Sequence, residues 1–209
     1  MNYTVRRIAC VIGFTLAFTA ALLQPAVAQP ITLPPMPDNI RVPPGYRPFL
    51  KGHAVGTQNY VCLPSGPSFA WTFFGPQATL FTDNNEQVFT HFLSANQFEN
   101  GTARATWEHS RDTSTVWAMP VASSTDPIFV APGAIPWLLL RVVGAQEGPT
   151  HGRTLMAAVF VQRLSTVGGV TPTTGCAQAE DLGKKALVPY RADYVFYKNR
   201  YSHDEGDDN

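Results

Sequence analysis

The feature that most constrains the fold is a succession of short β-strand patterns between residues 50 and 201. Runs of β-branched and aromatic residues alternate with clusters of Gly, Pro, Asn and Asp, which is typical of strands joined by turns. The candidate strands are 53–62, 69–74, 78–82, 87–93, 104–109, 115–121, 136–143, 154–164 and 190–198. We predict a single all-β domain, an antiparallel β-sandwich or a closed β-barrel of about nine to eleven strands, with minimal helix.

Local signals refine this prediction. Turn residues at 83–86 and 111–114 indicate hairpins. The runs 137–143 and 155–161 are apolar on both alternating faces, so we expect both to be covered on two sides. The best helical pattern is 177–182, followed by Gly183 where a left-handed cap would lie.

The N-terminus has the pattern of a signal peptide over residues 1–28. Arg6 and Arg7 precede an apolar stretch that ends before Gln24, and Ala26-Val27-Ala28 suits cleavage. The apolar stretch is shorter than the roughly 20 residues of a membrane-spanning helix. We predict a secreted or periplasmic protein with a Pro-rich extended arm at 29–49, an all-β domain at 50–201 and an acidic disordered tail at 202–209.

The charge balance excludes two classes of partner. The chain has 15 basic and 15 acidic residues, and cleavage removes two of the basic ones. A nearly neutral, slightly acidic domain has no long-range attraction for nucleic acid or for an anionic membrane surface. We therefore predict neither as a partner after processing.

Cleavage would also leave an even pair of cysteines. Cys10 lies in the signal peptide, so Cys62 and Cys176 remain, and an oxidising compartment favours a disulfide between them. A redox or metal-binding thiol pair is the alternative, but the chain has no Cys-x-x-Cys motif.

The signals for catalysis are weak. The common hydrolase, zinc-protease and P-loop motifs are absent. Glu108 with His91 or His109 is a candidate set for an extracellular hydrolase, and Glu108 with Glu99 or Asp112 is a candidate carboxylate pair for a glycosidase.

Imidazoles on adjacent strands can also bind metals. His53, His91 and His109 with Glu108 are a conceivable metal set. No spacing among them requires a metal, however, and we predict neither a metal nor a cofactor.

The binding candidates are aromatic residues and one arginine. Trp107 and Trp117 flank the polar turn at 111–114, where an exposed indole ring would stack on a sugar, whereas Trp71 and Trp137 lie in apolar runs and should be buried.

Arg163 ends an apolar strand pattern. At a barrel mouth it would bind a carboxylate or phosphate with two parallel hydrogen bonds. The favoured alternative is a structural arginine paired with Asp193 or a loop carbonyl.

Several segments resemble a known family. They lie in the order Gly52-His53-Ala54, Gly56-Thr57-Gln58-Asn59-Tyr60-Val61-Cys62, Phe74-Gly75-Pro76-Gln77-Ala78-Thr79-Leu80, Ala105-Thr106-Trp107-Glu108, Ile135-Pro136-Trp137-Leu138-Leu139, Gln162-Arg163-Leu164-Ser165-Thr166-Val167-Gly168-Gly169, Gly175-Cys176, Val188-Pro189-Tyr190 and Ala192-Asp193-Tyr194. Together they are similar to the secreted bacterial and fungal proteins known as domain of unknown function 3455. Many relatives have Gly-Pro where this chain has Arg104-Ala105, and often Asp-Gly-Ser where it has Asp112-Thr113-Ser114.

The resemblance implies a secreted all-β domain with paired cysteines and implies no activity. We therefore expect a disulfide-stapled domain that binds a small ligand or a glycan without catalysis, with the extracellular hydrolase as the alternative.

Overall fold

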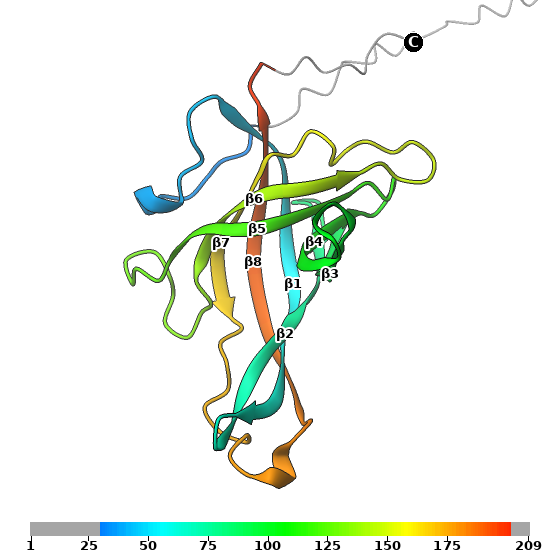
Figure 1. Cartoon of the computed structure of the whole chain (residues 1–209). Coiled ribbons are helices and arrows are strands. Elements are labelled where there is room, and N and C mark those ends of the chain that lie inside the picture. The colour runs from blue at the N-terminus through cyan, green and yellow to red at the C-terminus, as the bar shows by residue number, and fades with distance from the viewer. Residues whose placement is uncertain (1–29, 202–209) are drawn as a thin grey trace, which may run out of the picture. The chain divides into compact units, whose positions relative to one another are not determined.

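The computed structural model describes residues 30–201, and the elements below belong to the compact unit that begins at Ile31. Eight antiparallel strands pair in chain order, and the last pairs with the first to close a barrel (Figure 1). The elements are η1 (Asp38–Ile40), β1 (Tyr46–Ser65), β2 (Ser68–Phe81), β3 (Gln87–Asn96), η2 (Gln97–Glu99), β4 (Thr102–His109), β5 (Thr115–Ser124), β6 (Trp137–Gln146), β7 (Phe160–Gly168), η3 (Ala179–Asp181) and β8 (Lys185–Asn199). The all-β prediction is confirmed. Of the two predicted architectures, β-sandwich and closed β-barrel, the structure has the barrel.

The strand count is slightly lower than predicted, for a local reason. The segments 69–74 and 78–82 form the single strand β2, because Phe74 bulges out of the ladder instead of ending it: Asn59 pairs with Gly75 and Tyr60 with Phe73. Gly75, at φ +147°, accommodates this irregularity.

Two other predicted boundaries change. The segment 154–164 becomes a strand only from Phe160, because residues 154–157 form turns. The helical pattern at 177–182 shrinks to the 3-10 turn η3, while Gly183 has the expected positive φ of +80°.

Alternation along each strand separates an inner face from an outer face. In β1 the inward residues include Ala54, Gln58, Tyr60 and Cys62. The barrel interior holds a continuous apolar cluster that includes Leu80, Phe89, Trp107, Leu140, Tyr194 and Phe196. This interior forms the wall of the site described below.

A second apolar cluster covers the outer face of β6, β7 and β8. Met36 and Ile40, from the segment before β1, pack there against Trp137, Leu164 and Tyr197 among others. Together the two clusters cover β6 and β7 on both faces, as the apolar run 137–143 predicted for β6. Of the other apolar run, 155–161, only Phe160 and Val161 lie in β7.

Polar contacts fasten this N-terminal segment to the barrel. Gln162 Nε2 donates to Ile40 O at 2.6 Å, and the Tyr197 hydroxyl donates to Gln162 Oε1. β1 begins at Tyr46, inside the stretch that the sequence assigned to the Pro-rich arm at 29–49.

The predicted disulfide is present. Cys62, near the end of β1, is bonded to Cys176 in the loop before η3, with a Cα–Cα distance of 5.5 Å. Within residues 30–201, no helix has the length and apolar character needed to cross a membrane. The predicted signal peptide at 1–28 and acidic tail at 202–209 lie outside the described residues.

Candidate functional site

The barrel encloses a partly open cavity of about 110 Å³. It is lined by side chains from all eight strands, namely Gln58, Phe73, Pro76, His91, Leu93, Ala105, Trp107, Pro120, Leu138, Leu140, Arg163 and Tyr194. Most of these are apolar, and the polar members are few. A mostly apolar hollow with a few polar groups is the general character of small-molecule sites.

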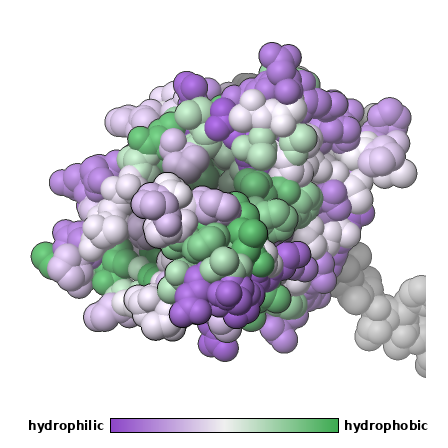
Figure 2. Space-filling view, turned by 60° about the horizontal axis from the view of Figure 1, so that its bottom comes forward, coloured by the Kyte–Doolittle hydropathy of each residue, from purple (hydrophilic) through white to green (hydrophobic). Residues whose placement is uncertain are grey.

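The cavity reaches the surface at an apolar rim. Phe73 and Leu93 line it and are still 48% and 39% exposed. Figure 2 turns toward the reader the end of the barrel that lies at the bottom of Figure 1, and hydrophobic side chains gather in the middle of this face with hydrophilic ones around them.

Two buried N–H donors in the cavity wall have no acceptor. Gln58 is 3% exposed and Trp107 is fully buried, yet Gln58 Nε2 and Trp107 Nε1 have no hydrogen-bond partner. Burial raises the pKa of Tyr190, and the nearby Gln58 amide offsets only part of that effect. A buried polar group without a partner costs about 1–3 kcal/mol, so both donors favour an incoming acceptor.

Arg163 adds a positive charge to the same wall. Its Nε and Nη2 donate to Pro136 O at 3.1 and 2.9 Å, which is the loop-carbonyl partner that we favoured from the sequence. Within residues 30–201 no carboxylate pairs with Arg163. The guanidinium has five N–H groups, of which Pro136 O binds two. Burial raises the pKa of Tyr194, and the interaction of Arg163 with that hydroxyl offsets part of the rise.

His91 lies on the cavity wall as a neutral ring. Its ring stacks on Trp107 with centroids 4.3 Å apart, and its Nδ1 lies 2.8 Å from Thr106 O. Because a carbonyl only accepts, Nδ1 carries the proton and Nε2 keeps its lone pair. Burial lowers the pKa of His91 to about 3, and the charge of Arg163 acts in the same direction.

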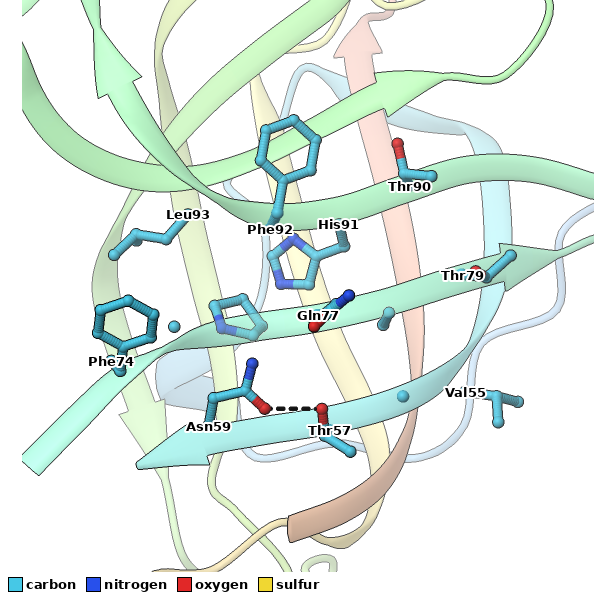
Figure 3. Close-up of a pocket in the computed structure, with 14 residues that line it drawn as sticks. Val55, Thr57, Asn59, Phe74, Gln77, Thr79, Thr90, His91, Phe92 and Leu93 are labelled. Atoms are coloured by element: carbon cyan, nitrogen blue, oxygen red, sulfur yellow. Dashed lines mark hydrogen bonds between the residues drawn. The ribbon is translucent and has the colours of Figure 1, made fainter. Parts of the chain in front are cut away.

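A larger open groove of about 880 Å³ adjoins the cavity on the outer face of β1, β2 and β3 (Figure 3). The last β2–β3 pair in this direction is Ala78 with His91, and beyond it the two strands separate. Pro76, His91 and Leu93 line both hollows and thus form the wall between them. Figure 3 shows Phe74 beside Leu93 at one end of the groove.

The tryptophans lie differently from what the sequence suggested. Trp107 and Trp117 were the candidates for an exposed, sugar-stacking ring, but they are only 0% and 6% exposed. Trp107 faces the barrel interior, and Trp117 lies on the outer face under Phe98, with its Nε1 donating to Ser94 Oγ. Trp137 is buried as expected, whereas Trp71 is half-buried.

The candidate catalytic side chains do not converge. Across the β3–β4 ladder His91 pairs with Trp107 and Thr90 pairs with Glu108. Because neighbouring residues alternate in direction, Glu108 lies on the outer face while His91 and His109 lie on the inner one. His109 packs on Phe89 and accepts from the Asp112 backbone N–H. The hydrolase hypothesis therefore loses its geometric support.

The carboxylates proposed as a pair with Glu108 have structural partners. Glu99 receives two hydrogen bonds from Arg104, at 2.8 and 2.7 Å.

The histidines and Glu108 considered as a metal set do not form one. His53 lies on the outer face between Asp193 and Asp83. Within residues 30–201, no group of three or more His, Cys, Asp or Glu side chains is arranged to hold a metal ion.

Asp112 fastens two loops together. Its carboxylate accepts from Ser114 N, Ser114 Oγ and Thr154 N, at 2.9, 2.7 and 2.9 Å. Burial alone would raise the pKa of Asp112, but the hydrogen bonds from Thr154 and Ser114 outweigh it and lower that pKa well below its usual range.

We expect Asp112→Ala to lower the free energy of unfolding by about 1–3 kcal/mol at pH 7, because three donors lose their acceptor. A depressed pKa gives stability that is complete above the unfolded pKa of about 3.9 and is lost as the pH falls through the folded pKa. The difference between parent and variant in urea denaturation should therefore shrink below about pH 4. A difference that stays constant from pH 7 to pH 2.5 would contradict this role.

Sequence reasoning missed Gln58 and Tyr194. Gln58 shares its parity in β1 with Ala54, Tyr60 and Cys62, so the alternation already placed a polar amide on the inner face. Tyr194 required the pairing of β8 with β7, where it lies opposite Arg163.

A protein-family model described as "Protein of unknown function (DUF3455)" matches residues 43–198, which span the barrel from β1 to the penultimate residue of β8. No curated protein and no solved structure matches the chain.

Proposed function

The chain belongs to this family of proteins of unknown function, and from its barrel we propose that it binds a small ligand in the inner cavity without turning it over. The observation that carries this proposal is the pair of buried, unpartnered N–H donors of Gln58 and Trp107 in the wall of an otherwise apolar hollow. Each donor gains its missing hydrogen bond when an acceptor enters.

The chemistry of the wall favours binding over turnover. Among the residues that line this cavity there is no carboxylate, thiol or aliphatic hydroxyl to act as nucleophile or acid. His91 is neutral with Nδ1 committed to Thr106 O, and Glu108 faces the other side of β4. Burial also raises the pKa of Tyr194, which keeps that hydroxyl protonated.

Two features typical of exported proteins support the same proposal. The Cys62–Cys176 disulfide is stable in an oxidising compartment such as the periplasm or the extracellular medium. The N-terminal pattern over residues 1–28 is that of a cleaved leader. We propose that the mature protein captures its ligand there.

The test compares a cavity-filling variant with a matched control. Ala105→Leu places a larger side chain in the cavity, whereas Ala103→Leu makes the same change on the same strand at an exposed position outside it. The probes are benzene, 2-butanone and isobutyrate, added to the oxidised mature chain in a thermal unfolding assay.

We expect at least one probe to raise the unfolding temperature of the parent and of Ala103→Leu, by about 2–4 °C for each kcal/mol of binding free energy. Ala105→Leu should remove this rise. If none of the three probes stabilises the parent, or if Ala105→Leu responds as the parent does, the proposal fails.

A further inference from the structure

We propose that the inner cavity is a carboxylate site, and that the ligand class is a small carboxylic acid with a short apolar body. This inference rests on the proposed function and adds the chemical class of the ligand. It is carried by three of the cavity-lining residues that have hydrogen-bond donors to spare, which are Gln58, Trp107 and Arg163.

The donors favour an acceptor-only group. Gln58 Nε2 and Trp107 Nε1 present N–H groups without acceptors, and Arg163 presents further N–H groups besides those bound to Pro136 O. A carboxylate offers two oxygens with about four acceptor positions, so it can satisfy donors from several directions. A hydroxyl or an amine would bring donors of its own into a wall that already has an excess of them.

Charge distinguishes a carboxylate from a neutral carbonyl. Arg163 is half-buried, and within residues 30–201 it has no acidic partner. The only other ionisable groups that line the cavity, His91 and Tyr194, are neutral, because burial lowers the pKa of the first and raises that of the second. An anionic ligand would therefore neutralise the positive charge of Arg163. Its hydrogen bonds would be charge-assisted, and such bonds are about twice as strong as neutral ones.

Size and polarity define the rest of the ligand. An apolar cavity of roughly 150 Å³ holds benzene, so the 110 Å³ available here suits a molecule or terminal group of similar or slightly smaller size. Leu138, Leu140, Ala105 and Phe73 provide an apolar surface for its body. A longer apolar tail would leave past Pro76 and Leu93, which also border the outer groove.

The experiment titrates the oxidised mature chain with isobutyrate and, separately, with its neutral isostere isobutyramide. The Trp107 indole N–H resonance reports the arrival of an acceptor and is assigned by its absence in Trp107→Phe. We expect a dissociation constant for isobutyrate on the order of millimolar, a downfield shift of the Trp107 indole proton at saturation, and binding of isobutyramide at least about tenfold weaker.

Three variants separate recognition from folding. Gln58→Leu removes the unpartnered Nε2 donor together with the interaction of this amide with the Tyr190 hydroxyl, so it should weaken isobutyrate about tenfold and change the unfolding temperature little. Gln87→Leu makes the same change at an exposed position at the start of β3, where the amide donates to Ser110 Oγ at 3.2 Å outside the cavity, and it should leave the affinity unchanged. Arg163→Lys keeps the charge but removes the fork of donors, so it should weaken binding and reduce the preference for the acid over the amide.

The outcomes distinguish the inference from the function on which it rests. Equal binding of isobutyrate and isobutyramide, or binding of benzene alone, overturns the carboxylate class and leaves ligand binding standing. An unchanged isobutyrate affinity in Gln58→Leu also overturns it. If isobutyrate, isobutyramide, 2-butanone and benzene all fail to bind, both proposals fail.

Discussion

Reduction of the Cys62–Cys176 disulfide lowers the free energy of unfolding by up to about 5 kcal/mol, because it releases a constraint on a long loop of the unfolded chain. The two cysteines are 114 residues apart, and the closed loop contains most of the barrel. In the chain-entropy model the benefit grows with the logarithm of loop length, so this single bond is near the upper end of the range.

The measurement compares oxidised and reduced forms of one sequence, since replacing the fully buried Cys62 would add a cavity to the effect. Guanidinium denaturation with and without reductant should give a lower midpoint for the reduced form and a changed slope, because the reduced unfolded chain exposes more surface. If the oxidised and reduced forms unfold at the same guanidinium concentration, the disulfide does not contribute to the free energy of unfolding.

Hydrogen exchange locates the effect in the folded protein. The backbone pairs Cys62 N with Lys184 O and Gly183 N with Cys62 O, each at 2.9 Å, and these bonds do not need the disulfide. We therefore expect exchange to accelerate in the loop around Cys176 on reduction, while the amide of Cys62 stays protected.

The strands were predictable because their information is local. Alternation and turn residues gave the positions of most strands, and the hairpins at 83–86 and 111–114 are where their residues placed them. Barrel closure was not predictable in the same way, because it depends on pairs such as Gly56 with Tyr190, which are far apart in the chain. A local pattern predicts that a strand forms, but it does not predict which other strand pairs with it.

The site shows the same division. Arg163 was identified because a charged residue at the end of an apolar run is a local anomaly. Trp107 was misjudged because it is close in sequence to a polar turn, while its direction is set by the register that pairs it with His91. The cavity combines residues of all eight strands, so its existence follows from closure and not from any single segment.

The second large effect is expected at Gly56, where β1 and β2 approach too closely for any side chain. A Cβ at this position would lie 2.1 Å from Gln77 O and 2.5 Å from Ala78 Cα, which are both backbone atoms of β2. Flexible side-chain ends can move aside, but here the strand itself must move. Gly56→Ala should therefore lower the free energy of unfolding by about 3 kcal/mol or more.

A matched glycine separates this steric cost from the usual cost of replacing glycine. Gly66, at the tip of the β1–β2 hairpin, has φ +60°, and no atom lies within 4 Å of a Cβ built there. Gly66→Ala should cost only the left-handed conformation, about 1 kcal/mol. If urea denaturation gives equal losses for the two variants, β2 yields easily at Gly56 and the close contact is not a constraint.

The close approach of the strands at Gly56 also affects the cavity. Two residues further along β1, Gln58 pairs with Pro76 in the same β1–β2 ladder. Displacement of β2 would move Pro76 away from Gln58, and both line the cavity. In Gly56→Ala the affinity for isobutyrate should therefore fall together with stability, whereas Gly66→Ala should leave the affinity unchanged. A destabilised Gly56→Ala that binds isobutyrate as tightly as the parent would show that the cavity does not depend on this close approach.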